Sequence, residues 1–166
     1  MTTRPLAEIV PQEMKELRTR PLFALLLDVQ LATVIGKTPG ADRRVGVING
    51  GRFEGERLRG MVLAGGSDWQ TVRGGDGAWT LDVRVVLKTD DGELIGMTYR
   101  GLRHGPKDVL ERIARGEVVS PNSYYLRIAP FFETASDRYG WLNGIIAVGV
   151  GHRLPEGPVY QVFEIL

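Results

Sequence analysis

Residues 81–100 read LDVRVVLKTDDGELIGMTYR, and this stretch decides the fold. Apolar and polar residues alternate on both sides of the sequence DDG at 90–92, as in two strands that each bury one face. A three-residue loop that ends in a left-handed glycine is a common connection between antiparallel strands. The stretch therefore predicts a β-hairpin in which Thr89 lies opposite Glu93.

The faces of this hairpin fix its pairing register. With a three-residue loop, Asp82 pairs with Arg100 on one face, and the other face is apolar apart from one phenol. That predicted core face consists of Leu81, Val83, Val85, Leu87, Ile95, Met97 and Tyr99. A two-residue loop would place Val83 opposite Arg100, and such a slip is penalised wherever one face is buried. We therefore predict the three-residue loop.

Similar alternation recurs through most of the chain after residue 20. The longest alternating segment, residues 22–35, would extend about 46 Å as one strand, so we expect it to coil around a core. The dipeptide Asn49-Gly50 is typical of a two-residue turn, although pairing around it gives no clean faces. We predict an all-β fold, a mainly antiparallel small β-barrel.

The sequence predicts one helix in this β-rich chain. Residues 106–115 start with proline, which is favoured at the first helical position, and a glycine follows them. The apolar side of this helix carries Val109, Leu110, Ile113 and Ala114. We expect this short helix to plug one barrel end. Residues 1–20 are predicted to be an N-terminal extension of a single domain spanning residues 1–166.

Composition excludes several classes of protein. Lys and Arg number 21 against 20 Asp and Glu, and no long basic run occurs, so the electrostatic footprint of a nucleic-acid or anionic-membrane surface is missing. The absence of cysteine excludes disulfides and thiolate chemistry. No apolar stretch approaches the roughly 18 residues of a membrane span, and no secretory signal is visible. We expect a cytoplasmic protein without nucleic-acid or membrane partners.

Common catalytic signatures are missing from the sequence, including the P-loop, the nucleophile elbow and the zinc-protease motif. Spaced glycines at 46–51 and 148–151 do not open a helix after a strand, as a dinucleotide site requires. His104 and His152 have no carboxylate at metal-ligand spacing, so we interpret them as loop or surface residues. We expect no metal and no cofactor.

Asp68 is the main candidate for a catalytic base. It lies in the sequence GGSDWQ at 65–70, where glycines deliver a carboxylate and the indole of Trp69 to the start of a strand. Partial burial there would raise the pKa of Asp68 toward the range useful for a general base. The alternative interpretation is a turn in which Asp68 caps backbone amides and Trp69 enters the core.

Two further groups of residues are candidates for ligand contacts. Arg84 lies on the polar face of the hairpin, the face that carries the pair Asp82 and Arg100. If this face points to solvent, its charges form ordinary surface ion pairs, and if it points into a barrel, they contact a ligand. Residues 124–132 and 139–143 are rich in aromatics. On the first segment Tyr125 and Arg127 share one strand face, so one face packs and the other borders a cavity or partner. Core packing explains most of these aromatics, but Arg127 and Asn143 need hydrogen-bond partners if buried.

Several ordered motifs give the chain a family resemblance. They are GGRFEG at 50–55, GGSDWQ at 65–70, TDDG at 89–92, YRG at 99–101 and WLN at 141–143. Together they resemble domain of unknown function family 3237, also called uncharacterised protein family 0311, from about Leu22 to the C-terminus. The resemblance implies a single β-barrel similar to small lipocalin-like or allene-oxide-cyclase-like barrels, and it brings no general activity and no catalytic set.

The residues favour a small-molecule enzyme of cofactor-independent lyase, isomerase or cyclase type that acts on an apolar or aromatic metabolite. In this hypothesis Asp68 is the base, and Tyr99 or Arg127 stabilises developing negative charge. The ligand contacts would come from Trp69, Arg84, Tyr125, Trp141 and Asn143. Two alternatives stay open: a non-catalytic module that binds or carries a similar ligand, and a structural subunit of a homo-oligomer.

Overall fold

The structure is a computed structural model that describes residues 3–166. Its strands are β1 (Thr19–Val29), β2 (Thr33–Lys37), β3 (Asp42–Glu54), β4 (Arg59–Val62), β5 (Gly66–Val72), β6 (Trp79–Thr89), β7 (Leu94–His104), β8 (Tyr125–Glu133), β9 (Ala147–Leu154) and β10 (Gly157–Ile165). The helices are α1 (Leu6–Ile9) and α2 (Lys107–Ala114), with 3₁₀ segments at Gln12–Met14, Pro121–Ser123 and Gly140–Gly144. No helix among the described residues is long and apolar enough to cross a membrane.

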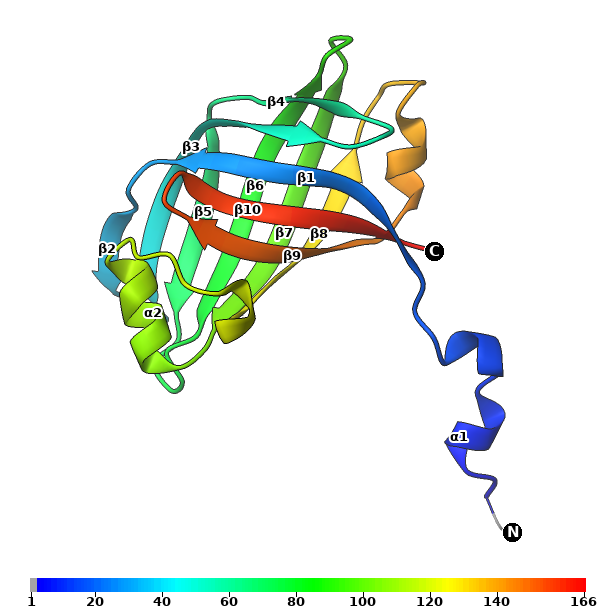
Figure 1. Ribbon diagram of the computed structural model, residues 1–166, viewed down its shortest axis with the longest axis horizontal. Helices are drawn as coiled ribbons and strands as arrows, with labels where there is room; N and C mark the ends of the chain where they lie inside the picture. Colours follow the sequence, from blue (N-terminus) through cyan, green and yellow to red (C-terminus); the bar gives the residue numbers. More distant parts are fainter. Residues whose placement is uncertain (1–2) are drawn as a thin grey trace.

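The strands close into an antiparallel barrel (Figure 1). Neighbours around the wall follow the order β1, β10, β9, β8, β7, β6, β5 and β3, and β3 pairs with β1 to complete the circle. The short strand β4 joins β3 to β6 beyond the end of β5, and β2 pairs with β3. The predicted small antiparallel β-barrel is therefore confirmed.

The hairpin of β6 and β7 has the predicted register. Val83 pairs with Tyr99, Asp82 pairs with Arg100, and the Thr89 amide donates to the Glu93 carbonyl across the loop. Every residue of the predicted core face is buried, none exposing more than 7 % of its surface. The three-residue loop is thus confirmed, because it alone keeps charge out of the face that turns into the barrel.

The prediction of one coiled strand over residues 22–35 is wrong. β1 ends at Val29, and the chain resumes as β2 at Thr33, with Leu31 almost fully exposed between them. The register of β1 against β3 shifts at Asp28 and Val29, and β2 then pairs with the first residues of β3. The alternation of apolar and polar residues continues beyond residue 29, but the apolar side chains there, Val34 and Ile35, stay exposed.

The Asn49-Gly50 dipeptide is not a turn, because β3 runs through it. At this point β3 changes its partner, from β5 at Ile48 to β4 at Gly51. Gly51 has a φ of 147°, and a Cβ there would lie 2.3 Å from the backbone oxygen of Leu26 on β1. Glycine is therefore required here for the close approach of two strands in a bent barrel wall.

The helix α2 confirms the predicted segment and lies at one end of the barrel (Figure 1). Pro106 is its N-cap, and Val109 and Ile113 are buried against the core. Near the N-terminus, residues 3–18 bury none of their side chains and extend away from the barrel (Figure 1).

Candidate functional site

The inside of the barrel is divided into an apolar end and a polar end. The apolar end is filled by Phe23, Phe53, Leu87, Ile95, Met97 and Phe132. The polar end, toward the other termini of the same strands, carries Arg44, Asp68, Gln70, Trp79, Tyr99, Arg103, Arg153 and Tyr160. Strand register brings these side chains together, since Arg44 pairs with Gln70 and Trp79 pairs with Arg103.

Asp68 lies on the inward face of β5, opposite Val83 of β6. Only 7 % of the residue is exposed. The Gln70 side-chain amide donates to its Oδ2 at 2.7 Å, whereas its Oδ1 has no hydrogen-bond partner. Burial raises the pKa of Asp68 to about 6, although the hydrogen bond from Gln70 and the positive charge of Arg103 oppose this effect. The carboxylate is therefore placed to exchange protons near neutral pH.

Two buried phenols, Tyr99 and Tyr160, face each other near this carboxylate. Their ring centroids are 5.7 Å apart. Burial raises the pKa of both hydroxyls, and the charge of Asp68 raises it further. The interaction between the two hydroxyls raises the pKa of Tyr99 further and partly offsets the rise for Tyr160. Both phenols therefore stay protonated near neutral pH.

Arginines and an indole form the outer layer of the polar end. The guanidinium of Arg44 lies 4.7 Å from the ring centroid of Trp79, and that of Arg103 lies 4.3 Å from it. Burial lowers the pKa of Arg103, and the charge of Arg153 lowers it as well. The Nε of Arg44, the Nε of Arg103 and the Nη1 of Arg153 are buried without hydrogen-bond partners.

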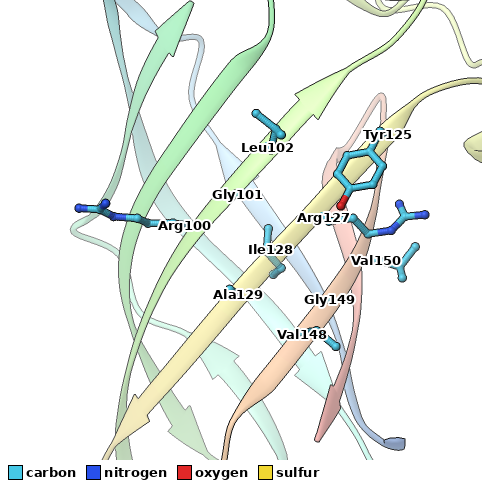
Figure 2. Close-up of a pocket in the computed structure, with 10 residues that line it drawn as sticks. All are labelled: Arg100, Gly101, Leu102, Tyr125, Arg127, Ile128, Ala129, Val148, Gly149 and Val150. Carbon is cyan, nitrogen blue, oxygen red and sulfur yellow. The ribbon is translucent and has the colours of Figure 1, made fainter. Parts of the chain in front are cut away.

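A separate groove of about 590 Å³ lies on the barrel wall, where β8 and β9 pair through only two residue pairs (Figure 2). The groove is lined by Arg100, Gly101, Leu102, Tyr125, Arg127, Ile128, Ala129, Val148, Gly149 and Val150. Arg127 lies over the ring of Tyr125, and its Nη1 donates to the backbone oxygen of Leu126. The lining holds no carboxylate or histidine, so it offers two guanidinium groups but no general base.

Comparison with known proteins places this barrel in a family. The family model described as protein of unknown function (DUF3237) matches residues 17–165. The chain belongs to the DUF3237 family. The resemblance seen in the sequence motifs is thereby confirmed, and the match includes all of the barrel strands.

Relatives of this DUF3237 protein share both its sequence and its fold. A UPF0311 protein of Clostridium acetobutylicum is 36% identical over 152 residues, which cover 91% of this chain and 96% of the relative. A crystal structure described as a β-barrel-like protein of Acinetobacter baumannii has a TM-score of 0.78 and 37% sequence identity, with 91% of this chain and 97% of that chain covered. More distant is the hydroalkoxylation enzyme phnH of Penicillium herquei, 25% identical over 120 residues, which cover 72% of this chain and 61% of that enzyme.

The DUF3237 barrel brings together only two of the predicted site residues in its interior, Asp68 and Tyr99. Trp69 follows Asp68 on the strand and therefore points outward, where it is 47% exposed. The expectation that this indole lies beside the carboxylate is wrong. Burial inside the barrel, rather than the indole, raises the pKa of Asp68. Asp68 is also not a turn-forming cap, because it lies within β5.

The remaining predicted residues lie outside the interior of this DUF3237 barrel. Arg84 is on the exposed face of β6, and Arg127 and Tyr125 meet in the outer groove. Trp141 stacks under the guanidinium of Arg57 at 4.0 Å. Asn143 holds a loop closed, since its side chain accepts from the Thr134 amide and donates to the Thr134 carbonyl. These two residues have packing roles and do not touch the polar end.

Histidines do not contribute a metal site in the described part of the chain. His104 is exposed and stacks on Tyr125, while the Nδ1 of His152 lies 2.9 Å from the hydroxyl of Tyr124. That hydroxyl also accepts from the amide of Arg153, so Tyr124 bridges the gap between β8 and β9. Among residues 3–166 no three histidine, aspartate or glutamate side chains gather closely enough to hold a metal ion.

Proposed function

We propose that the polar end is the active site of a cofactor-independent enzyme of lyase, isomerase or cyclase type that acts on a small metabolite. The observation that supports this proposal is the buried carboxylate of Asp68, which has one unpartnered oxygen and a pKa of about 6. A group with this pKa is about nine-tenths ionised at pH 7 and is still basic enough to accept a proton. Burial also strengthens its interaction with any charge that forms nearby.

In the proposed reaction Asp68 Oδ1 accepts a proton from a C–H or O–H group of the substrate. The electron pair that is left behind delocalises into the substrate, and the developing negative charge is stabilised by the Tyr160 O–H. Tyr99 is a positioning residue, whose ring centroid lies 5.7 Å from that of Tyr160. The proton on Asp68 then returns to a different atom of the substrate, so the reaction balances without a cofactor.

The distant relative supports this class of chemistry. Hydroalkoxylation adds an O–H group across a carbon–carbon double bond, and it needs a base for the hydroxyl proton and an acid that protonates carbon. Asp68 offers both functions in turn, first as the carboxylate that takes the hydroxyl proton and then as the acid that returns a proton to carbon. In this proposal the indole of Trp79 stacks on the substrate, in place of the ligand contacts expected from Trp69 and Trp141, because Trp79 lies at the polar end and they do not.

The proposal is tested by proton exchange in deuterated water. A panel of alkenyl phenols and aromatic ketones is incubated with the protein, and deuterium incorporation at carbon is followed by NMR. We expect a rate that rises with ionisation of Asp68 through pH 6, and an Asp68→Asn rate at least about 100-fold lower. The matched control, Arg127→Gln in the outer groove, should keep the rate of the parent protein.

Equal exchange rates in Asp68→Asn and the parent protein would contradict the assignment of the base. Binding of panel members without any exchange would favour the alternative, a module that binds or carries its ligand. A small-molecule ligand, the lack of nucleic-acid and membrane partners, and a homo-oligomeric state stay predictions. Ligand affinity that changes little with salt would agree with the first two.

A further inference from the structure

We infer that the substrate of the polar end carries a carboxylate, and that Arg44, Arg103 and Arg153 bind this group. The inference rests on the proposed function, because it names the substrate class of the same site. It also changes the sequence-based expectation of an apolar ligand, since the layer of the site above Asp68 is cationic.

The first line of evidence is the set of unused hydrogen-bond donors. One buried N–H nitrogen of each of the three arginines has no acceptor. None of the three side chains takes part in an ion pair with any residue of the described chain. Buried polar groups in folded proteins are almost always partnered, so three such donors at one barrel end are available to an acceptor that binds there.

The second line of evidence is the way in which Trp79 holds two of these groups. Arg44 and Arg103 both place their guanidinium groups over the indole ring. Cation–π contact uses the face of a guanidinium and leaves its N–H edge free for hydrogen bonds in the plane. A carboxylate is planar and accepts two parallel N–H bonds from such an edge.

The third line of evidence is charge. Arg103 is largely buried, and burial lowers the pKa of its guanidinium, as does the positive charge of Arg153 nearby. Asp68 attracts Arg103, but no hydrogen bond or ion pair joins the two residues, and Oδ1 of Asp68 is itself unpartnered. A monoanionic ligand would neutralise part of the excess positive charge while leaving the carboxylate of Asp68 free to accept a proton.

The arrangement also orders the ligand relative to the base. Asp68 is opposite Val83, whereas Trp79 lies four residues nearer the barrel end on the same strand and the same face. At about 3.3 Å per residue this separation is about 13 Å along the strand. A substrate whose carboxylate binds the arginines would therefore extend along the strand, stack its conjugated part on Trp79 and present its distal atoms to Asp68.

Binding of simple probes tests this inference without any turnover. Benzoate, benzamide and phenyl phosphate are each titrated into the full-length protein by isothermal calorimetry. We expect benzoate to bind at least tenfold more tightly than the isosteric neutral benzamide, and more tightly than phenyl phosphate. Arg103→Gln and Arg44→Gln should each weaken benzoate binding at least tenfold, and the outer-groove variant Arg127→Gln should not change it.

The variants also separate this inference from the proposed function. Asp68→Asn should retain benzoate binding even if Asp68 proves not to be a base, because the amide removes a negative charge from the site. Arg103→Lys, which keeps the charge but lacks the planar edge, should bind benzoate more weakly than the parent protein and guards against misfolding of Arg103→Gln. Equal affinity for benzoate and benzamide would overturn the inference, as would tighter binding of phenyl phosphate or unchanged benzoate affinity in both arginine-to-glutamine variants.

Discussion

Replacing Asp68 by Asn should stabilise this protein at alkaline pH, although it removes the proposed catalytic base. The pKa of Asp68 is raised from 3.8 to about 6, mainly by burial. A carboxyl group whose folded-state pKa is raised contributes stability below its unfolded pKa, and this contribution is lost as pH rises through the folded pKa. At pH 8 the folded protein must therefore hold a buried carboxylate that water would solvate better.

The magnitude follows from the two pKa values. Their difference corresponds to about 3 kcal/mol in the free energy of unfolding. Between pH 8 and pH 5 the free energy of unfolding rises by about 1.4 kcal/mol of this amount. At pH 5 Asp68 is mostly protonated in the folded state and mostly ionised in the unfolded state. The Asn side chain imitates the protonated acid in shape and can still accept from Gln70, so it avoids this cost at every pH.

Urea unfolding of the two proteins between pH 5 and pH 8 measures the effect. Asp68→Asn should be more stable than the parent protein at pH 8 by up to about 3 kcal/mol, and the gap should shrink by about 1.4 kcal/mol at pH 5. Asp28→Asn, at an exposed position of β1, is the matched control and should stay within about 0.5 kcal/mol of the parent at both pH values. A gap that is constant with pH, or that widens toward pH 5, would refute the argument that burial sets the pKa of Asp68.

Two further predictions concern the frame around the site. Val85→Asp should lower the free energy of unfolding by more than about 2 kcal/mol, because Val85 is only 5% exposed inside the barrel. Lys88→Ala on the outer face should lower it by less than about 0.5 kcal/mol. Equal urea midpoints for the two variants would contradict the assigned faces. Glu164→Gln should lose about 1 kcal/mol at pH 7 and less at pH 4. Burial raises the pKa of Glu164, but hydrogen bonds from Arg20 and Arg57 have the larger combined effect and lower the pKa below its usual value. The contribution of the Glu164 carboxylate to stability is therefore present above the unfolded pKa and is lost as pH falls through the folded pKa. Identical losses at both pH values would argue against this pairing.

The register of the central hairpin was predictable because two local signals agree on it. The loop chemistry at residues 90–92 and the apolar face from Leu81 to Tyr99 permit one pairing only. Asp68 could be singled out as a candidate for a different reason, since glycines before a lone carboxylate and an indole stand out in a sequence without other catalytic signatures, and its role as a base stays a prediction. Alternation failed at residues 30–35, where it continued beyond the last strand that could cover the apolar side chains.

The outward-facing candidates show what a strand pattern leaves undetermined. Alternation separates the residues of a strand into two faces, but it does not say which face turns inward until a neighbour's register is known. Tyr125 and Arg127 were correctly grouped on one face of β8, and that face is the outer one. Asn143 and Trp141 lie outside regular strands, so their partners Thr134 and Arg57 could not be inferred from spacing.

The arginine layer, by contrast, was partly within reach of the sequence. Extending the hairpin register by two more pairs places Trp79 opposite Arg103, on the same inward face as Tyr99. An arginine on the inward face of a small barrel needs an acceptor, and that requirement alone indicates a polar end. Arg44 and Arg153 needed the closed barrel, because β3 and β9 reach this end only through pairings with β5 and β10. The same closure explains why the apolar end can stabilise the fold while the polar end holds unpartnered groups, because close packing of apolar side chains in one half of the barrel offsets the cost of buried polar groups in the other half.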